Sequence, residues 1–341
     1  MMGKRQLSED KALSVKDIAA RAGVSVATVS RVINQKANVS SKTQARVREA
    51  IALNNYVPNM IARSLKTNKT PLIGIIVPDI SGEFYNTMVQ KLQTRLLEKQ
   101  YLTFILNTKK SADIEKEYQE WQNLLQVSGW LVLDCAVDFG ADRDAPIVYI
   151  NWPGAPTDER TVSISSDAPL GGHLAGRELI QSGCKSIAVI TSSNKLEKRV
   201  GGFLSAIREH NDPDIAVLLR HVKIEDVNSA EGYRQMNGIM EVFPGVDGVF
   251  CIADRFVPGV LKALEEAGRR VPEDVKVVGH DDTPIASWLS GGFTTVRQDM
   301  NRMSDLAIDA LMRLLNGETV KERKVILPET LVRRRTTKAG S

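Results

Sequence analysis

The strongest constraint on this chain lies in its first 33 residues, where two short helical patterns are separated by one glycine. Ser14 and Asp17 have the spacing of a helix N-cap and its reciprocal acidic partner. An apolar face at helical spacing follows from Val15, Ile18 and Ala19. Gly23 can adopt the left-handed conformation that ends a helix. We therefore expect a short capped helix that ends in a tight turn.

A second helix is predicted directly after this turn, with Ser25 as its cap. Its inward side chains are Val29, Val32 and Ile33, and its outward side chains are Val26, Ala27, Thr28, Ser30 and Arg31. A third helix is expected from Ser41, with Gln44 as capping partner and an inward set of Val47, Ala50, Ile51 and Leu53. Two helices joined by such a turn form a helix-turn-helix, whose second helix enters the major groove of DNA.

The charge distribution supports a DNA-binding head. Residues 1–70 contain 13 Lys and Arg against 4 Asp and Glu, whereas residues 71–341 contain 32 against 37. The net charge of +4 for the whole chain is therefore the sum of a basic head and a slightly acidic body. A basic head attracts phosphate and makes binding dependent on salt. The alternative, in which the motif joins two core helices of an enzyme, does not account for this asymmetry.

The stretch from Val15 to Leu65 resembles the LacI family of bacterial transcription regulators, and residues 54–65 (NNYVPNMIARSL) are close to its hinge signature. The resemblance implies that this segment becomes a short helix on DNA, pairs with its dimer mate and contacts the minor groove through Asn59, Ala62 and Leu65. Leu65 would be the wedge that kinks the central base step. An ordinary linker helix, with Leu65 packed on the body, is the alternative.

Position in the family motif and outward placement together identify the residues of the second helix that are expected to contact DNA. We expect base contacts from Val26, Ala27 and Arg31, and phosphate contacts from Ser25, Thr28 and Ser30. An arginine can bind a guanine edge through two hydrogen bonds, which is worth about 1 to 3 kcal/mol of discrimination. A phosphate contact is the alternative role for Arg31.

The rest of the chain has an α/β pattern. Continuous apolar runs predict strands near 72–77, 102–106, 130–133, 147–150, 187–190, 246–252 and 275–278. Amphipathic stretches of helical length lie between most of them, for example 85–99, 114–126, 170–182 and 258–267. This alternation predicts parallel sheets covered by helices, with ligands bound at the carboxyl ends of the strands.

The resemblance to the LacI family continues through this body and implies the fold of a periplasmic sugar-binding protein, with two lobes and an effector between them. The expected domains are a helix-turn-helix at 1–58, a hinge at 59–70 and an effector-binding and dimerisation domain at 71–341. Within the last domain, the first lobe is expected at about 71–163 and 294–326, and the second at about 164–293 and 327–337.

Polar and aromatic residues that follow the predicted strands are candidates for the effector site. Arg199 and Asp281 match an arginine and an aspartate that bind effector in the family, and such a pair can bracket neighbouring hydroxyls. The further candidates are Gln298, Asn151, Asp79, Phe84, Tyr85 and Trp152. Core packing is the alternative for the aromatic residues, and a salt bridge or turn cap is the alternative for Asp281.

Some positions depart from the family pattern. Ala253 stands where a polar residue is frequent, Ala168 where asparagine is usual, and Gly82-Glu83 where Asn-Pro is common. Val227 occupies a position that is aromatic in some members. A pocket that has lost hydroxyl partners favours an unusual, smaller or charged ligand.

Neither catalysis nor a cofactor is expected. The 4 histidines have no metal-ligand spacing, and Cys135, Cys184 and Cys251 lie far apart. His280 followed by two aspartates is only a weak metal-site candidate, because such sites need three or four ligands. Isolated cysteines, together with the absence of an apolar leader or a membrane-length run, lead us to expect a cytoplasmic protein without a membrane partner.

The sequence therefore predicts a transcriptional repressor of a carbohydrate uptake or catabolism operon, controlled by a sugar, sugar acid or sugar phosphate bound between the two lobes. Two-fold symmetry of a homodimer predicts a near-palindromic operator. A nucleobase-, nucleoside- or corepressor-responsive regulator of the same family remains an alternative. So does a solute-binding module that lacks regulatory DNA binding.

Overall fold

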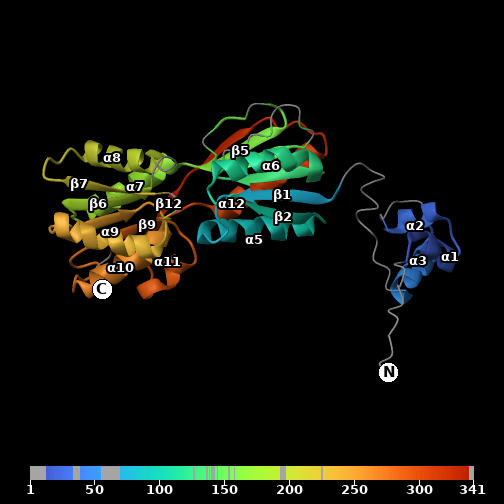
Figure 1. Ribbon diagram of the computed structural model, residues 1–341, viewed down its shortest axis with the longest axis horizontal. Coiled ribbons are helices and arrows are strands. Elements are labelled where there is room, and N and C mark those ends of the chain that lie inside the picture. The colour runs from blue at the N-terminus through green and yellow to red at the C-terminus, as the bar shows by residue number, and fades with distance from the viewer. Residues whose placement is uncertain are drawn as a thin grey trace, which may run out of the picture. The chain divides into compact units, whose positions relative to one another are not determined.

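The computed structural model describes residues 13–33, 39–54, 70–125, 127–135, 137, 139, 143, 145–152, 154–156, 158–192, 197–223 and 226–337. The chain divides into two compact units, the head at residues 1–70 and the body at residues 71–341 (Figure 1). Each unit has its own hydrophobic core.

The head contains the three predicted helices, α1 (Val15–Ala22), α2 (Val26–Ile33) and α3 (Ser41–Leu53). The capping box of α1 is present: the backbone N–H of Ser14 donates to Asp17 Oδ2 at 2.8 Å, and the backbone N–H of Asp17 donates to Ser14 Oγ at 3.4 Å. Gly23 has φ of 60°, so it ends α1 in the left-handed conformation as predicted. Ile18, Val29 and Val47, one from each helix, are buried together in the core of the head.

The start of α3 differs from the prediction. Its N-cap is Ser40, whose Oγ accepts from the backbone N–H of Thr43 at 3.4 Å. The Gln44 amide donates instead to the carbonyl of Val39 at 3.0 Å. Leu53, expected in the core, is 77% exposed, because it lies in the last turn of α3, beyond Val47 and Ala50.

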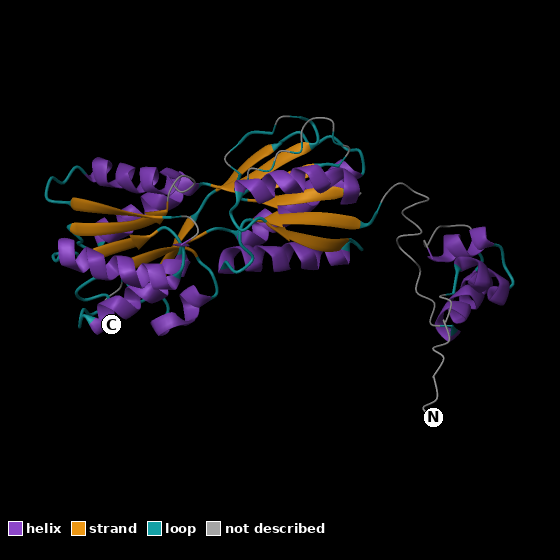
Figure 2. Cartoon of the chain, in the orientation of Figure 1, coloured by secondary structure: helices purple, strands orange, loops and turns teal. Residues whose placement is uncertain are grey.

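The body is built on two six-stranded sheets (Figures 1 and 2). The first has the order β11-β5-β4-β3-β1-β2, and all its neighbouring strands are parallel. Its strands are β1 (Leu72–Val77), β2 (Leu102–Asn107), β3 (Gly129–Leu133), β4 (Ile147–Ile150), β5 (Thr161–Ser166) and β11 (Lys324–Leu327).

The second sheet has the order β12-β10-β9-β8-β6-β7 and is parallel except for β12, which is antiparallel to β10. Its strands are β6 (Ser186–Ser192), β7 (Ala216–Val222), β8 (Gly248–Cys251), β9 (Lys276–Asp281), β10 (Thr294–Arg297) and β12 (Thr330–Val332). The predicted fold class, a helical head and an α/β body with two parallel-sheet lobes, is confirmed.

Helices cover both faces of each sheet (Figure 1). On the first sheet, α5 (Glu83–Glu98) and α12 (Met300–Leu315) pack together on one face, and α6 (Ala112–Leu125) covers the other. On the second sheet, α7 (Ala168–Gln181) and α8 (Glu197–His210) lie opposite α9 (Ser229–Val242) and α10 (Val257–Glu266). Three short helices complete this lobe: η2 (Asp254–Phe256), α11 (Ile285–Trp288) and η3 (Leu289–Gly291).

The chain passes between the two sheets three times, at Asp167, at residues 298–299 and at residues 328–329. These crossings correct the expected lobe boundaries. Residues 294–297 were assigned to the first lobe, but they form β10, which pairs with β9 and β12 in the second sheet. In the same way, β5 continues the first sheet to Ser166 rather than ending at 163.

Candidate functional site

Three polar residues at the ends of parallel strands have an unusual backbone. Asp134 follows β3 with φ of 45°, Asn151 follows β4 with φ of 56°, and Asp281 ends β9 with φ of 119°. Few non-glycine residues adopt positive φ, and such strain gathers at functional sites. All three line one cavity, so the strain marks a place where the sheets direct polar groups inward.

This cavity lies between the two lobes and has a volume of about 150 Å³. Seven of the eight predicted effector residues line it: Phe84, Tyr85, Asn151, Trp152, Arg199, Asp281 and Gln298. The residues that sequence reasoning did not propose as contacts are Gly82, Lys110, Asp134, Ser165, Ser166, Ala168, Lys198, Val227, Ala253 and Arg255. The cavity therefore has a wall of aromatic side chains and several charged groups.

Arg199 lies on α8 and is only 8% exposed. Its Nη1 donates to the carbonyl of Ile252 at 2.7 Å, and its Nη2 lies 3.6 Å from Asp281 Oδ1. Its Nε has no hydrogen-bond partner among the residues that the structure describes. A buried guanidinium with a spare N–H, beside a carboxylate, can bind a polar ligand.

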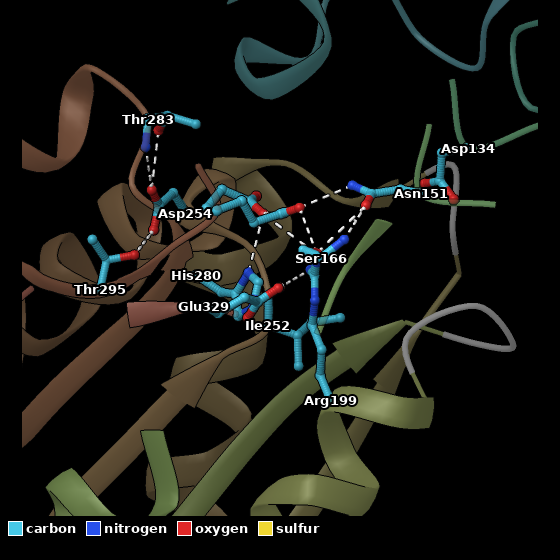
Figure 3. Close-up of polar contacts among 12 residues, drawn as sticks. Asp134, Asn151, Ser166, Arg199, Ile252, Asp254, His280, Thr283, Thr295 and Glu329 are labelled. Carbon is cyan, nitrogen blue, oxygen red and sulfur yellow. Dashed lines mark hydrogen bonds and ion pairs between the residues drawn. The ribbon is translucent and has the colours of Figure 1, made fainter. Parts of the chain in front are cut away.

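A chain of hydrogen bonds joins Asp281, in the second lobe, to the first lobe. The Gln298 amide donates to Asp281 Oδ1 at 2.7 Å, and Gln298 Oε1 accepts from Asn151 Nδ2 and Ser166 Oγ, both at 2.9 Å. The backbone N–H of Ser166 donates to Asn151 Oδ1 at 3.0 Å, so both ends of the Asn151 amide are used (Figure 3). Ser166 precedes the first crossing and Gln298 lies in the second.

His280, beside this network, forms a buried ion pair with Glu329 in the third crossing. His280 Nε2 lies 2.7 Å from Glu329 Oε2, and His280 Nδ1 lies 3.1 Å from Asp281 Oδ1 (Figure 3). Burial and the charge of Arg199 lower the pKa of His280, but Glu329 and the hydrogen bonds outweigh them and leave it raised. Burial raises the pKa of Glu329, yet His280 and Arg199 bring it below its ordinary value.

His280 and the two aspartates that follow it were also considered as a metal site. Both ring nitrogens of His280 already face carboxylates. Within the described part of the chain, no group of three or more His, Cys, Asp and Glu side chains is placed to hold a metal ion. The histidine and its neighbouring aspartate therefore belong to the junction of the lobes.

Asp254, in η2, is a further buried carboxylate close to the cavity (Figure 3). It accepts from the backbone N–H and hydroxyl of Thr283 at 2.8 and 3.1 Å, and from the hydroxyl of Thr295 at 2.7 Å. Burial and the nearby Asp281 raise the pKa of Asp254 to about 8 despite these hydrogen bonds. It fixes the loop after β9 and the strand β10 to η2.

The aromatic wall is held by both ring contacts and a hydrogen bond. Phe84 and Tyr85 are in edge contact with centroids 5.4 Å apart, and Trp152 stacks on Tyr149 at 4.2 Å. The Tyr85 hydroxyl donates to Asp134 Oδ2 at 2.7 Å. Burial and the Asp134 carboxylate raise the pKa of Tyr85 well above its ordinary value. Phe84 is also part of the first-lobe core, so it both packs and lines the cavity.

Asp79 is the one predicted effector residue that does not line the cavity. Its carboxylate accepts from Arg255, which reaches across from η2 in the second lobe, with Nη1 2.9 Å from Asp79 Oδ2. Lys110 Nζ lies 3.9 Å from the same oxygen. No sequence signal links residues 79 and 255, which only the fold brings together.

In the head, the residues expected to contact DNA lie on one accessible surface of α2. Ser25, Val26, Ala27, Ser30 and Arg31 are exposed and Thr28 is half-buried, whereas Val29 and Val32 are buried. Ser25 Oγ accepts from the backbone N–H of Thr28 at 3.2 Å, so Ser25 also caps the helix. The minor-groove candidates Asn59, Ala62 and Leu65 lie outside the described residues.

Comparison with known proteins identifies the two units. Residues 14–59 match the family described as bacterial regulatory proteins, lacI family, and residues 177–337 match a periplasmic binding protein-like domain. The chain is 31% identical to the HTH-type transcriptional repressor PurR of Serratia proteamaculans, over 96% of this chain and 97% of that protein. The chain belongs to the LacI family. The PurR repressor of Photorhabdus laumondii subsp. laumondii is also 31% identical, over 94% of this chain and 96% of that protein.

Solved structures extend the likeness to the whole LacI-family architecture. The Lac repressor dimer bound to operator and the anti-inducer ONPF has a TM-score of 0.82 and 25% identity, covering 96% of this chain and 100% of that one. The transcriptional regulator CelR in complex with cellobiose has a TM-score of 0.68 and 26% identity, covering 95% of this chain and 99% of that one.

Family membership also settles the class of activity. The chain is a DNA-binding transcriptional regulator with a periplasmic-binding-protein-like body, and it is not an enzyme. In the described residues, no helix combines the length and the apolar character needed to cross a membrane.

Proposed function

We propose that this LacI-family regulator represses transcription by binding a near-palindromic operator as a homodimer in the cytoplasm, and that a small molecule in the interlobe cavity controls its affinity for DNA. The exposed face of α2 would read the major groove, and the hinge residues Asn59, Ala62 and Leu65 the minor groove. The Lac repressor, a structural relative, has been solved as a dimer on its operator.

One observation carries the proposal of ligand control. Ser166, directly before the first crossing between the lobes, and Gln298, in the second, both line the cavity, and the adjacent His280 is bonded to Glu329 in the third. A ligand that prefers one arrangement of these contacts changes the relative stability of two lobe arrangements. That change would be transmitted to the hinge and so to the DNA contacts.

A carbohydrate is the effector class that we favour. Arg199 and Asp281 can bracket neighbouring hydroxyls, and Trp152 offers a flat apolar surface for a sugar ring. The structurally similar CelR binds cellobiose. The alternative is a nucleobase or nucleoside, acting as inducer or corepressor. The aromatic wall of Phe84, Tyr85 and Trp152 would favour it through stacking, and sequence relatives are named PurR.

The first test is selection of genomic fragments by the purified protein at about 0.15 M salt, where non-specific phosphate binding is weak. We expect enrichment of a short palindrome upstream of a transport or catabolic operon. Recovery of no site, with or without candidate ligands, would contradict the regulator mechanism and favour a solute-binding module.

Two substitutions separate DNA reading from ligand control. Arg31→Ala is expected to relax base preference at one position in each half-site, with a cost of about 1 to 3 kcal/mol. Arg199→Ala should leave operator binding intact and abolish the effector response, while Arg177→Ala, an exposed arginine on α7, serves as the matched control. A normal effector response in Arg199→Ala would show that Arg199 does not bind the ligand.

A further inference from the structure

Arg46, on α3, reaches the turn between the first two helices of the head. Its Nη2 donates to the carbonyls of Ala22 and Gly23 at 2.5 and 3.3 Å. Ala22 is the last residue of α1, and Gly23 is its C-cap. Within residues 13–33 and 39–54, the described part of the head, α3 makes no other side-chain hydrogen bond to α1, α2 or their turn. The polar link between α3 and this turn therefore depends on one guanidinium.

The carbonyls that Arg46 binds are of the kind that a helix end leaves unpaired. The preceding carbonyls, those of Ala19 and Ala20, accept from backbone N–H groups of the turn at 3.0 and 3.2 Å. The carbonyl of Ala22 comes next, at the negative end of the helix dipole. A guanidinium suits this place, because it has several N–H donors and its positive charge opposes the dipole. Arg46 thus completes the C-terminal cap of α1.

The glycine of the turn also makes room for the guanidinium. Gly23 has φ of 60°, a conformation that favours glycine by itself. A Cβ atom at this position would in addition lie only 2.7 Å from Arg46 Nη2. A side chain at residue 23 would therefore displace the arginine as well as strain the turn. The close approach of α3 to the turn depends on both residues.

This turn leads directly into the helix that is expected to read bases. Ser25 caps α2 through the backbone N–H of Thr28, and Val26 and Ala27 lie in the first turn of the helix. In a helix-turn-helix, the N-terminal residues of the second helix contact base edges. Such contacts need positions accurate to about 0.5 Å, so the groups that hold the start of α2 affect specificity. The core of the head holds the buried face of α2, and Arg46 holds the turn before it.

We infer that Arg46 is a positioning residue for base reading, which holds the turn at Gly23 and so sets where the first turn of α2 lies in the major groove. The inference rests on the proposed reading of DNA by α2. In this role Arg46 contacts neither a base nor a phosphate. Its loss should therefore lower the discrimination between operator and other DNA, while the number of phosphate contacts stays the same.

Hydrogen exchange of the full chain without DNA measures the link directly. In Arg46→Met, which keeps the length of the side chain, we expect the backbone amides of residues 22–29 to exchange about 10-fold faster than in the wild type. Arg46→Lys keeps a charged donor and should recover part of the protection. Arg48→Met is the matched control, since Arg48 is exposed on α3 and has no side-chain hydrogen bond or ion pair among the described residues. Equal exchange in Arg46→Met and Arg48→Met would overturn the inference.

Exchange in the other helices shows whether Arg46→Met remains folded. Ile18 on α1 and Val47 on α3 are completely buried, so the amides around them should stay protected while the core is intact. Loss of protection in all three helices of Arg46→Met, without recovery in Arg46→Lys, would overturn the inference. The arginine would then stabilise the head as a whole rather than position the turn.

Operator binding separates positioning from a phosphate contact. The full-length variants are titrated with the operator that the wild type selects and with a duplex of random sequence, at several salt concentrations. We expect Arg46→Met to lower the ratio of the two affinities about 10-fold, Arg46→Lys to recover part of it and Arg48→Met to leave it unchanged. A phosphate contact would instead lower the salt slope for both duplexes by about 0.9 for each head and preserve the ratio. That result would overturn the positioning role.

The positioning role and the proposed reading by α2 fail in different ways. If the wild type selects an operator and Arg46→Met binds it with unchanged discrimination, α2 reads DNA and the positioning role is wrong. If the wild type selects no sequence, both are wrong, even where the exchange rates show that Arg46 holds the turn.

Discussion

At the residue scale, the buried pair of His280 and Glu329 is the most consequential contact at the junction of the lobes. Neither side chain is accessible to solvent, and each supplies the opposite charge that the other needs. Glu329 also leaves no room for a side chain at Gly171 on α7, because a Cβ atom there would overlap the Glu329 carboxylate. The pair, with Asp281, links β9 to the third crossing.

The opposite pKa shifts of this pair predict how body stability depends on pH. His280 has a raised pKa, so its contribution is complete below its ordinary value of 6.5 and is lost as pH rises through the folded-state pKa. Glu329 has a lowered pKa, so its contribution is complete above its ordinary value of 4.5 and is lost as pH falls through the folded-state pKa. The pair should therefore stabilise the body most between pH 4.5 and 6.5.

Urea unfolding of the wild type and His280→Gln would measure this contribution. We expect a loss of about 3 kcal/mol near pH 6, because Glu329 is left buried without its partner, and a smaller loss near pH 9. All 4 tryptophans lie in the body, so their fluorescence reports its unfolding. A loss that is equal at both pH values would mean that His280 is neutral in the folded protein.

At the element scale, the contact between α7 and α8 positions Arg199. Gly172 on α7 and Gly202 on α8 let the two helix backbones touch, since a Cβ atom at either would overlap a backbone carbonyl of the other helix. We expect Gly202→Ala to destabilise the body by about 1 to 3 kcal/mol and to weaken effector binding as α8 moves. Gly201→Ala, one residue away, meets no atom within 4 Å.

Gly201→Ala should therefore be neutral, or stabilise the body by up to about 1 kcal/mol through helix propensity. The two variants make the same chemical change in the same helix, so their unfolding free energies and effector affinities can be compared directly. Similar values for both would show that α8 tolerates a shift and that close packing does not position Arg199.

The elements also show what the sequence can and cannot predict. All seven continuous apolar runs form strands, because parallel strands buried on both faces require such runs. The strands β5, β7 and β10 were missed, because polar residues interrupt their apolar pattern: serines in β5, Arg220 and His221 in β7, and two threonines in β10. The strands β11 and β12 are short, and both lie at sheet edges.

The residues of the cavity and its surroundings were also predicted only in part. Residues that end apolar strands, such as Asn151 and Asp281, could be inferred because parallel sheets bind ligands at that edge. The roles of Ser166, Arg255 and Glu329 could not be inferred from the sequence. Their partners, which are Gln298, Asp79 and His280 respectively, lie 132, 176 and 49 residues away along the chain. Glutamate is rarely buried, so only the fold shows that Glu329 faces a histidine.

At the scale of the whole molecule, the proposed homodimer requires a surface that a second copy can cover. Trp288 on α11 is 84% exposed, and exposed tryptophans are enriched in protein interfaces. We expect Trp288→Lys to shift the protein toward monomers in sedimentation measurements at micromolar concentration. Operator affinity should fall with it, because one head then reads only one half-site.

Trp288→Phe is the matched control, since it keeps an apolar ring at the same position and should preserve both the dimer and operator binding. Each half-site contributes its own phosphate and base contacts, so loss of the dimer should also lower the salt dependence of binding. If Trp288→Lys sediments as a dimer and binds operator normally, α11 lies outside the interface. The two heads would then be held together by another surface of the body.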